Sequence, residues 1–177
     1  MPEDMQEQLL CFTMGKCELH KLIPKNDGQL KQCEFMNASV HITSVALDDD
    51  DGVQYSVPIV VITNDDYDKD QDQKQEEKLP ITENLIFMRY EFTEDDDNAV
   101  EYDENGNQTS FKERTKIGFV FYYPELNVCS VIETDPQADE EQRELLQDFE
   151  QWISKILYII NERKVLRERN ANNAYLI

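Results

Sequence analysis

Residues 117–133 read IGFVFYYPELNVCSVIE, and this stretch indicates the fold class. Apolar side chains recur at every second position over Ile117–Tyr123, which is typical of a β-strand. The Pro-Glu-Leu-Asn sequence at 124–127 is typical of a turn, and Val128–Glu133 is again strand-like. The pattern therefore predicts an antiparallel hairpin.

Three earlier segments, at residues 38–47, 53–61 and 85–92, show a similar alternation. In the first, the apolar phase slips after Ile42, which predicts a bulge or a bend. In the second, Pro58 removes a hydrogen-bond donor, so we expect the strand to lie at a sheet edge there. The connections are too short for helical crossovers, so about five strands should form a mainly antiparallel sheet.

A long helix is predicted after the hairpin, from Pro136 to Arg169. Thr134-Asp135-Pro136 supplies N-terminal signals, and the bases near Arg169 suit the negative end of the helix dipole. Apolar residues recur at helical spacing, and we expect Trp152 to be the central buried residue. The apolar stripe is wide enough to face both the sheet and a partner chain. The resulting fold class is α+β, with the helix packed on the sheet.

The 177 residues suit a single domain, 1–177. We expect a sheet with acidic loops over 35–133, the helix within 134–170 and a tail at 171–177. Residues 1–34 leave two alternatives open, a strand pair turning at Gly15-Lys16 or a helix broken at Gly15. Four cysteines without a CxxC pair, after an acidic N-terminus, indicate reduced thiols and a cytoplasmic protein, or one in a particle assembled in the cytoplasm, not a secreted one.

Charge is the unusual property of the composition: 17 Lys and Arg against 38 Asp and Glu give −21. Such a negative field disfavours nucleic acid and anionic membranes as partners. The sequence contains no run of about 18 apolar residues, so we expect no membrane-spanning helix. The stretches 48–51, 64–77 and 94–107 carry most of the excess, and we expect them to be solvated loops. The expected acidic surface comprises Asp65, Asp66, Asp68, Asp70, Asp72, Asp95, Asp96 and Asp97.

Two arrangements have the residue types of a metal site. Asp66, Asp68, Asp70 and Glu77 copy four liganding positions of a calcium-binding EF-hand loop, but the loop has no glycine at its sharp turn and follows a strand. A solvated acidic loop explains that stretch better.

The second arrangement is Cys17, His20, Cys33 and His41, which supplies four zinc-ligand types, although only the Cys17-x-x-His20 pair has ligand spacing. Small core cysteines at 17, 33 and 129, with His20 as a polar loop or surface group, explain these residues better. We expect no metal and no cofactor.

Signatures of catalysis are missing from the sequence. No GxSxG, GxxxxGK[ST] or GxGxxG motif occurs, and among so many carboxylates no pair stands out as an acid and base. We therefore expect a protein that is not an enzyme.

Three classes of function are compatible with these features. The first is a structural assembly subunit acting through protein–protein contacts, by analogy a small connector or a tail- or neck-type component of a virus (phage) particle. The second is an acidic inhibitor, either an immunity protein or a DNA mimic that occupies a basic groove. The third is a metal-binding protein or an enzyme. Because the charge falls in expected loops and not on rigid elements at phosphate spacing, the assembly subunit is favoured.

The expected partners are other protein chains, as a homo-oligomer or within a larger complex. The basic end of the helix is opposite in sign to the acidic loops, so identical copies can contact head to tail. The alternative is that the bases complement the helix dipole and the acids keep the protein soluble. The expected partner-binding residues are Arg163, Lys164, Arg167, Arg169, Tyr175, Leu176 and Ile177.

Overall fold

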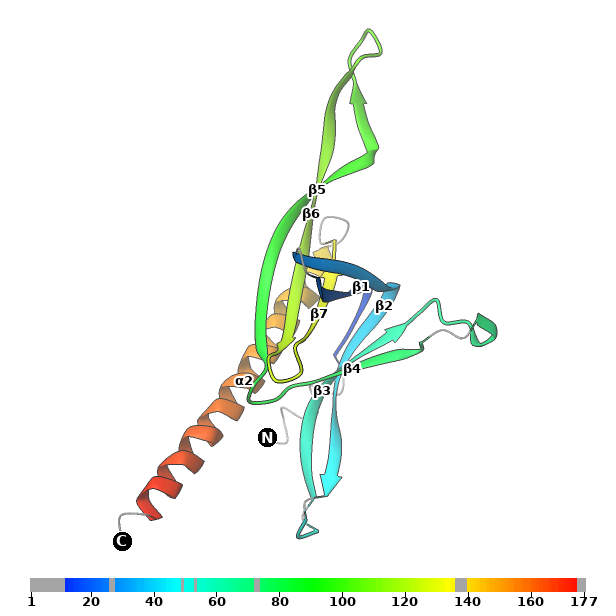
Figure 1. Ribbon diagram of the computed structural model, residues 1–177. Helices are drawn as coiled ribbons and strands as arrows, with labels where there is room; N and C mark the ends of the chain where they lie inside the picture. Colours follow the sequence, from blue (N-terminus) through cyan, green and yellow to red (C-terminus); the bar gives the residue numbers. More distant parts are fainter. Residues whose placement is uncertain are drawn as a thin grey trace.

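A computed structural model describes residues 12–25, 28–48, 50–52, 54–71, 74–135 and 140–174, without the side chains of 47, 48, 55, 94–101, 108–114 and 174. It contains a seven-stranded antiparallel sheet and one long helix (Figure 1). The α+β prediction is confirmed, but seven strands replace the expected five. The elements are β1 (Thr13–Lys25), β2 (Gly28–Asp48), β3 (Gln54–Asn64), β4 (Glu76–Pro80), β5 (Ile86–Tyr102), β6 (Gln108–Tyr123), β7 (Val128–Thr134) and α2 (Glu140–Ala174), and the strand order is β4-β3-β2-β1-β7-β6-β5.

Strand β1 corrects both expectations for the N-terminal segment. It is one continuous strand that pairs with β2 and β7. Lys16 has φ 56°, and the register with β2 shifts between Met14 and Cys17. The Gly15-Lys16 pair is therefore a bulge inside the strand, neither a hairpin turn nor a helix break.

Strand β4 is a short edge strand with the sequence EEKLP. Three of its five residues are charged, so it shows no alternation of apolar residues from which a strand could be predicted. Leu79 is buried in the core, and the pairing with β3 runs from Ile59 to Thr63. The β3 residues before Ile59 have no β4 partner, which confirms the edge position expected at Pro58.

The predicted bulge in β2 is wrong. The register between β2 and β3 runs without a shift from Ala38 opposite Asn64 to Asp48 opposite Gln54. The apolar phase slips after Ile42 because the β2–β3 hairpin leaves the core there, so 44–46 are exposed and burial no longer selects one face.

The acidic block 94–107 is mostly strand, which corrects the expected loop. Glu94 and Asp96 of β5 lie opposite Arg114 and Lys112 of β6, and the connection is confined to 103–107. The expectation of a solvated loop is therefore wrong for residues 94–102. This hairpin projects far from the body in Figure 1. The described acids at 50–51 and 65–70 do lie in connections, between β2 and β3 and between β3 and β4, whereas Asp48 ends β2 and Glu76 and Glu77 belong to β4.

Helix α2 ends five residues beyond the predicted Arg169, at Ala174. Residues 170–174 contain no glycine or proline to stop the helix, so most of the expected tail is helical. The start signal at Pro136 lies outside the described residues.

The first half of α2 packs on one face of the sheet. Phe149 is fully buried, with ring centroids 5.0 Å from Phe119 and 5.8 Å from Phe12. At the start of the helix, Gln142 Nε2 donates hydrogen bonds to Gly15 O at 2.9 Å and to Thr134 Oγ1 at 3.0 Å. These bonds fix the helix to the β1 bulge and to the end of β7.

The predicted role of Trp152 is wrong, because this side chain is half-buried. Phe149, Ile153 and Ile156 share the buried face at helical spacing, and Trp152 lies to one side of it. The Lys155 ammonium lies 5.4 Å from the Trp152 ring centroid.

The second face of the sheet lacks a covering layer over β5. Ile86 and Met88 are 44% and 55% exposed, so no described element of this chain covers the face of β5 that carries them. No described helix combines the length and the apolar character needed to cross a bilayer.

Candidate functional site

The second half of α2 extends beyond the sheet, as Figure 1 shows. Along this half, Leu157 and Ile160 pack against the core, and Lys164 is half-buried. Arg167 forms an ion pair with Glu83 in the connection between β4 and β5. Residues 157, 160, 164 and 167 follow helical spacing, so they define the face of α2 that is turned toward the body.

The opposite face of α2 carries large apolar side chains in solvent. Tyr158 is 64% exposed, Val165 47% and Leu166 56%. Successive residues are 100° apart around a helix, which places these three roughly opposite Ile153 and Ile160. They therefore contribute nothing to the monomer's core.

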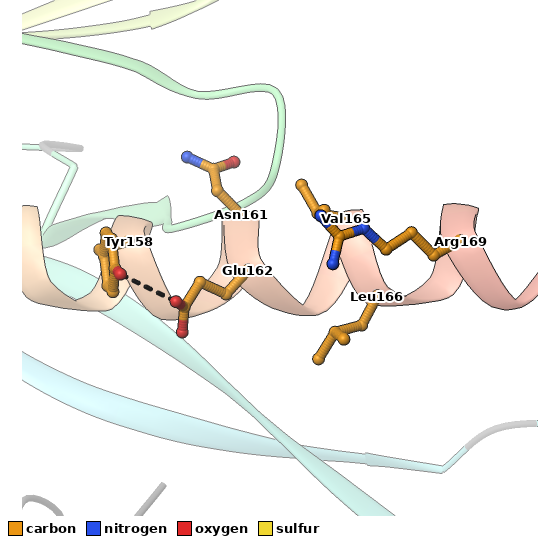
Figure 2. Close-up of a pocket in the computed structure, with 6 residues that line it drawn as sticks. All are labelled: Tyr158, Asn161, Glu162, Val165, Leu166 and Arg169. Atoms are coloured by element: carbon orange, nitrogen blue, oxygen red, sulfur yellow. Dashed lines mark hydrogen bonds between the residues drawn. The ribbon is translucent and has the colours of Figure 1, made fainter.

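Glu162 and Arg169 complete this outward face. Together with Asn161 and the three apolar residues, they line a depression of about 400 Å³ (Figure 2). The Tyr158 hydroxyl donates a 2.8 Å hydrogen bond to Glu162 Oε1, and this bond raises the pKa of Tyr158. We call Tyr158, Glu162, Val165, Leu166 and Arg169 the outward face.

The structure separates the basic residues that were expected to act together. Arg163 and Arg169 are exposed, whereas Arg167 is held by Glu83 and Lys164 is half-buried. The remaining expected partner-binding residues, Tyr175, Leu176 and Ile177, lie outside the described residues. Tyr158 was missed from the sequence because its position falls outside the apolar stripe that marks the core-facing side.

The acidic connection between β3 and β4 is organised by local hydrogen bonds. Ser39 Oγ donates to Asp65 Oδ2 at 2.7 Å, and Asn37 Nδ2 lies 3.5 Å from Asp66 Oδ1. The Asp70 amide donates to Asp68 Oδ1 at 3.0 Å. Asp72 and the side chains of Asp95, Asp96 and Asp97 lie outside the description.

The four calcium-ligand candidates do not gather around one point. Glu77 lies in β4 and forms ion pairs with Lys74 and, at 3.6 Å, with Lys21. A different group of described residues does bring three possible ligand atoms together. It consists of Glu18, His20 and Cys33.

This second group lies on the sheet face opposite α2. Glu18 and His20 alternate with the buried Leu19 along β1, and Cys33 of β2 lies directly opposite His20. Their ligand atoms lie within 4.8 Å of one another. The neighbouring Glu133 of β7, which lies opposite Glu18, is fully buried.

Two of the four residues weighed as zinc ligands therefore meet, and two do not. Cys17 points into the core, where burial, followed by the nearby carboxylates of Asp65 and Glu18, raises the pKa of its thiol to about 12. His41 lies on β2 outside the group. The sequence signal for Glu18 was its position two residues before His20, on the same face of a strand.

Charged partners lie around Glu18, His20 and the neighbouring Glu133. Lys31 forms an ion pair with Glu133, and Lys116 Nζ lies 3.0 Å from Glu18 Oε2. The Tyr90 hydroxyl donates a 3.3 Å hydrogen bond to Glu133 Oε1. The two lysines offset the two carboxylates, so the group carries little net charge although one carboxylate is fully buried.

No family model matches the chain, and no match was found among curated proteins or solved structures. A functional conclusion therefore rests on the two sites described above.

Proposed function

We propose that this protein is a non-catalytic assembly subunit, and that the outward face of α2 joins it to a second copy of the same chain. The observation that carries the proposal is the exposure of Tyr158, Val165 and Leu166 on a helix face turned away from the body. Adjacent exposed apolar side chains on one rigid element are typical of a protein-binding surface.

The order of residues on this face is self-complementary. Glu162 and Arg169 stand on either side of Val165 and Leu166. If two helices cross antiparallel about a two-fold axis near 165–166, each Glu162 meets the Arg169 of the other copy. The apolar residues then pack against their equivalents at the axis, as an isologous interface requires.

The distribution of charge also favours contact through the helix. The chain carries −21, whereas residues 163–169 contain four bases and one acid. Two copies that meet through the projecting half of α2 keep their acidic sheets and hairpins apart (Figure 1). Repulsion between the bodies is then weakened by distance and by salt.

Charge reversal tests the two-fold arrangement directly. Arg169→Glu and Glu162→Arg each place like charges across the axis, so each should weaken self-association about tenfold, and the double variant should restore it. Arg163→Glu is the matched control, because the same change of charge falls outside the outward face. The mass in solution is measured by light scattering after size-exclusion chromatography over a range of concentrations.

The head-to-tail contact with the acidic β3–β4 connection gives a different result. There, Glu162→Arg strengthens association, since it adds a base to a surface that meets acids, whereas Arg169→Glu weakens it. That outcome, or a wild-type chain that is monomeric at every concentration, contradicts the two-fold proposal.

A further inference from the structure

The group on the second face of the sheet has the chemistry of a metal site. We propose that Glu18, His20 and Cys33 bind a zinc ion, with the buried Glu133 carboxylate beside it. This site is independent of the outward face of α2, which lies beyond the other side of the sheet.

The ligand types match zinc. Zinc takes imidazole nitrogen, thiolate sulfur and carboxylate oxygen, and three protein ligands leave a fourth position for water. Calcium and magnesium prefer oxygen ligands alone, so the thiol of Cys33 and the imidazole of His20 disfavour both. The exposure of Cys33 provides a path for the ion to enter.

The distances also suit a small tetrahedral ion. His20 Nε2 lies 3.3 Å from Glu133 Oε2 and 3.8 Å from Glu18 Oε1. Ligand atoms about 2.0–2.3 Å from a tetrahedral zinc are about 3.3–3.8 Å from one another. The His20–Glu18 distance falls in this range, and the three proposed ligand atoms all lie within 4.8 Å of one another.

Two buried atoms at the centre make no hydrogen bond within the described part of the chain. They are His20 Nε2 and Glu133 Oε2, and the Glu133 side chain is 1% exposed. Buried polar atoms normally have partners, and lone pairs without hydrogen bonds are those that a cation uses. Lys31 forms its ion pair with Glu133 Oε1, and Lys116 forms its ion pair with Glu18 Oε2. The other oxygen of each carboxylate therefore lies toward His20.

The protonation states are compatible with binding. Burial lowers the pKa of His20, although the carboxylate of Glu133 opposes the shift. Burial and the carboxylates of Glu18 and Glu133 raise the pKa of Cys33. When zinc binds, the thiol of Cys33 releases its proton to solvent as the zinc–sulfur bond forms.

Cobalt is the probe that separates this site from adventitious binding by the acidic surface. We expect Co²⁺ added to the full chain to give a thiolate-to-cobalt charge-transfer absorption, and Zn²⁺ to displace it at one ion per chain. Cys33→Ser should abolish the band and weaken Zn²⁺ binding at least tenfold, whereas Cys129→Ser, the matched control, should change neither. His20→Gln should weaken binding similarly, with circular dichroism showing that both variants remain folded.

Cobalt binding without the thiolate band overturns the proposal, because it shows an adventitious ion on carboxylates only. Zinc affinity that is equal in wild type and Cys33→Ser overturns it as well. Neither result bears on self-association, so the failure of this site is distinguishable from the failure of the proposed function.

Discussion

A single glycine allows the hydroxyl of Tyr90 to reach the buried carboxylate of Glu133. Gly118 of β6 lies opposite both Glu133 and Tyr90, on the sheet face that carries the Glu18 group. A Cβ at Gly118 would lie 2.4 Å from the nearest Tyr90 ring atom. The absence of a side chain lets the ring lie across the strand, where its hydroxyl reaches Glu133.

We expect Gly118→Ala to destabilise the protein by about 1–3 kcal/mol, because the methyl group must displace the Tyr90 ring and break its hydrogen bond to the buried carboxylate. Gly15→Ala is the matched control, since the nearest atom to a Cβ there, Ser39 Oγ, is 3.9 Å away. Urea unfolding followed by circular dichroism gives both free energies of unfolding. Equal stability of Gly118→Ala and wild type would show that the ring does not depend on this glycine.

At the scale of elements, the side chains of α2 differ in burial according to the face of the helix on which they lie. Phe149 is fully buried among aromatic rings, whereas Trp152, one turn further on, is half-buried at the side of the same helix. Phe149→Ala should therefore cost about 3–5 kcal/mol, and Trp152→Ala clearly less, because its removal leaves no enclosed cavity. The same urea measurement compares them, and a larger loss for Trp152→Ala would mean that the helix docks through a different face.

The elements that the sequence predicted well are those whose pattern comes from burial against a single surface. Ile117–Tyr123 and the α2 stripe are examples, because alternation and helical spacing follow directly from one buried face. Strand β4 was not predicted because most of its residues are polar and are positioned by hydrogen-bonded pairing with β3, not by burial. Strand β1 was not predicted as one continuous strand because the bulge at Gly15-Lys16 interrupts its alternation of buried and exposed residues.

The two candidate sites were accessible to sequence reasoning to different degrees. His20 and Cys33 were recognised as ligand types, but only the pairing of β1 with β2 and β7 brings in Glu18 and Glu133 and turns Cys17 into the core. The outward face was hidden because a stripe of apolar residues does not reveal which of them the protein's own sheet covers. That assignment depends on tertiary packing, which sequence spacing does not contain.

At the scale of the whole molecule, the sheet is a small centre from which long elements project. The β2–β3 and β5–β6 hairpins and the second half of α2 extend in different directions (Figure 1). Acidic stretches lie on the hairpins and connections, and a net positive segment lies on the helix. Contacts through projecting elements suit a subunit that joins other chains without burying its sheet.

The most direct test is the mass of the full chain in solution, measured by light scattering at several concentrations beside a Val165→Ser/Leu166→Ser double variant. We predict that the wild-type protein associates to twice the 20.8 kDa mass of the chain, since these side chains meet across the two-fold axis. The variant should remain at 20.8 kDa with an unchanged free energy of unfolding, because neither residue belongs to the core. A wild-type protein that remains at 20.8 kDa, or a variant that associates equally well, would contradict the proposal that the outward face of α2 is the assembly surface.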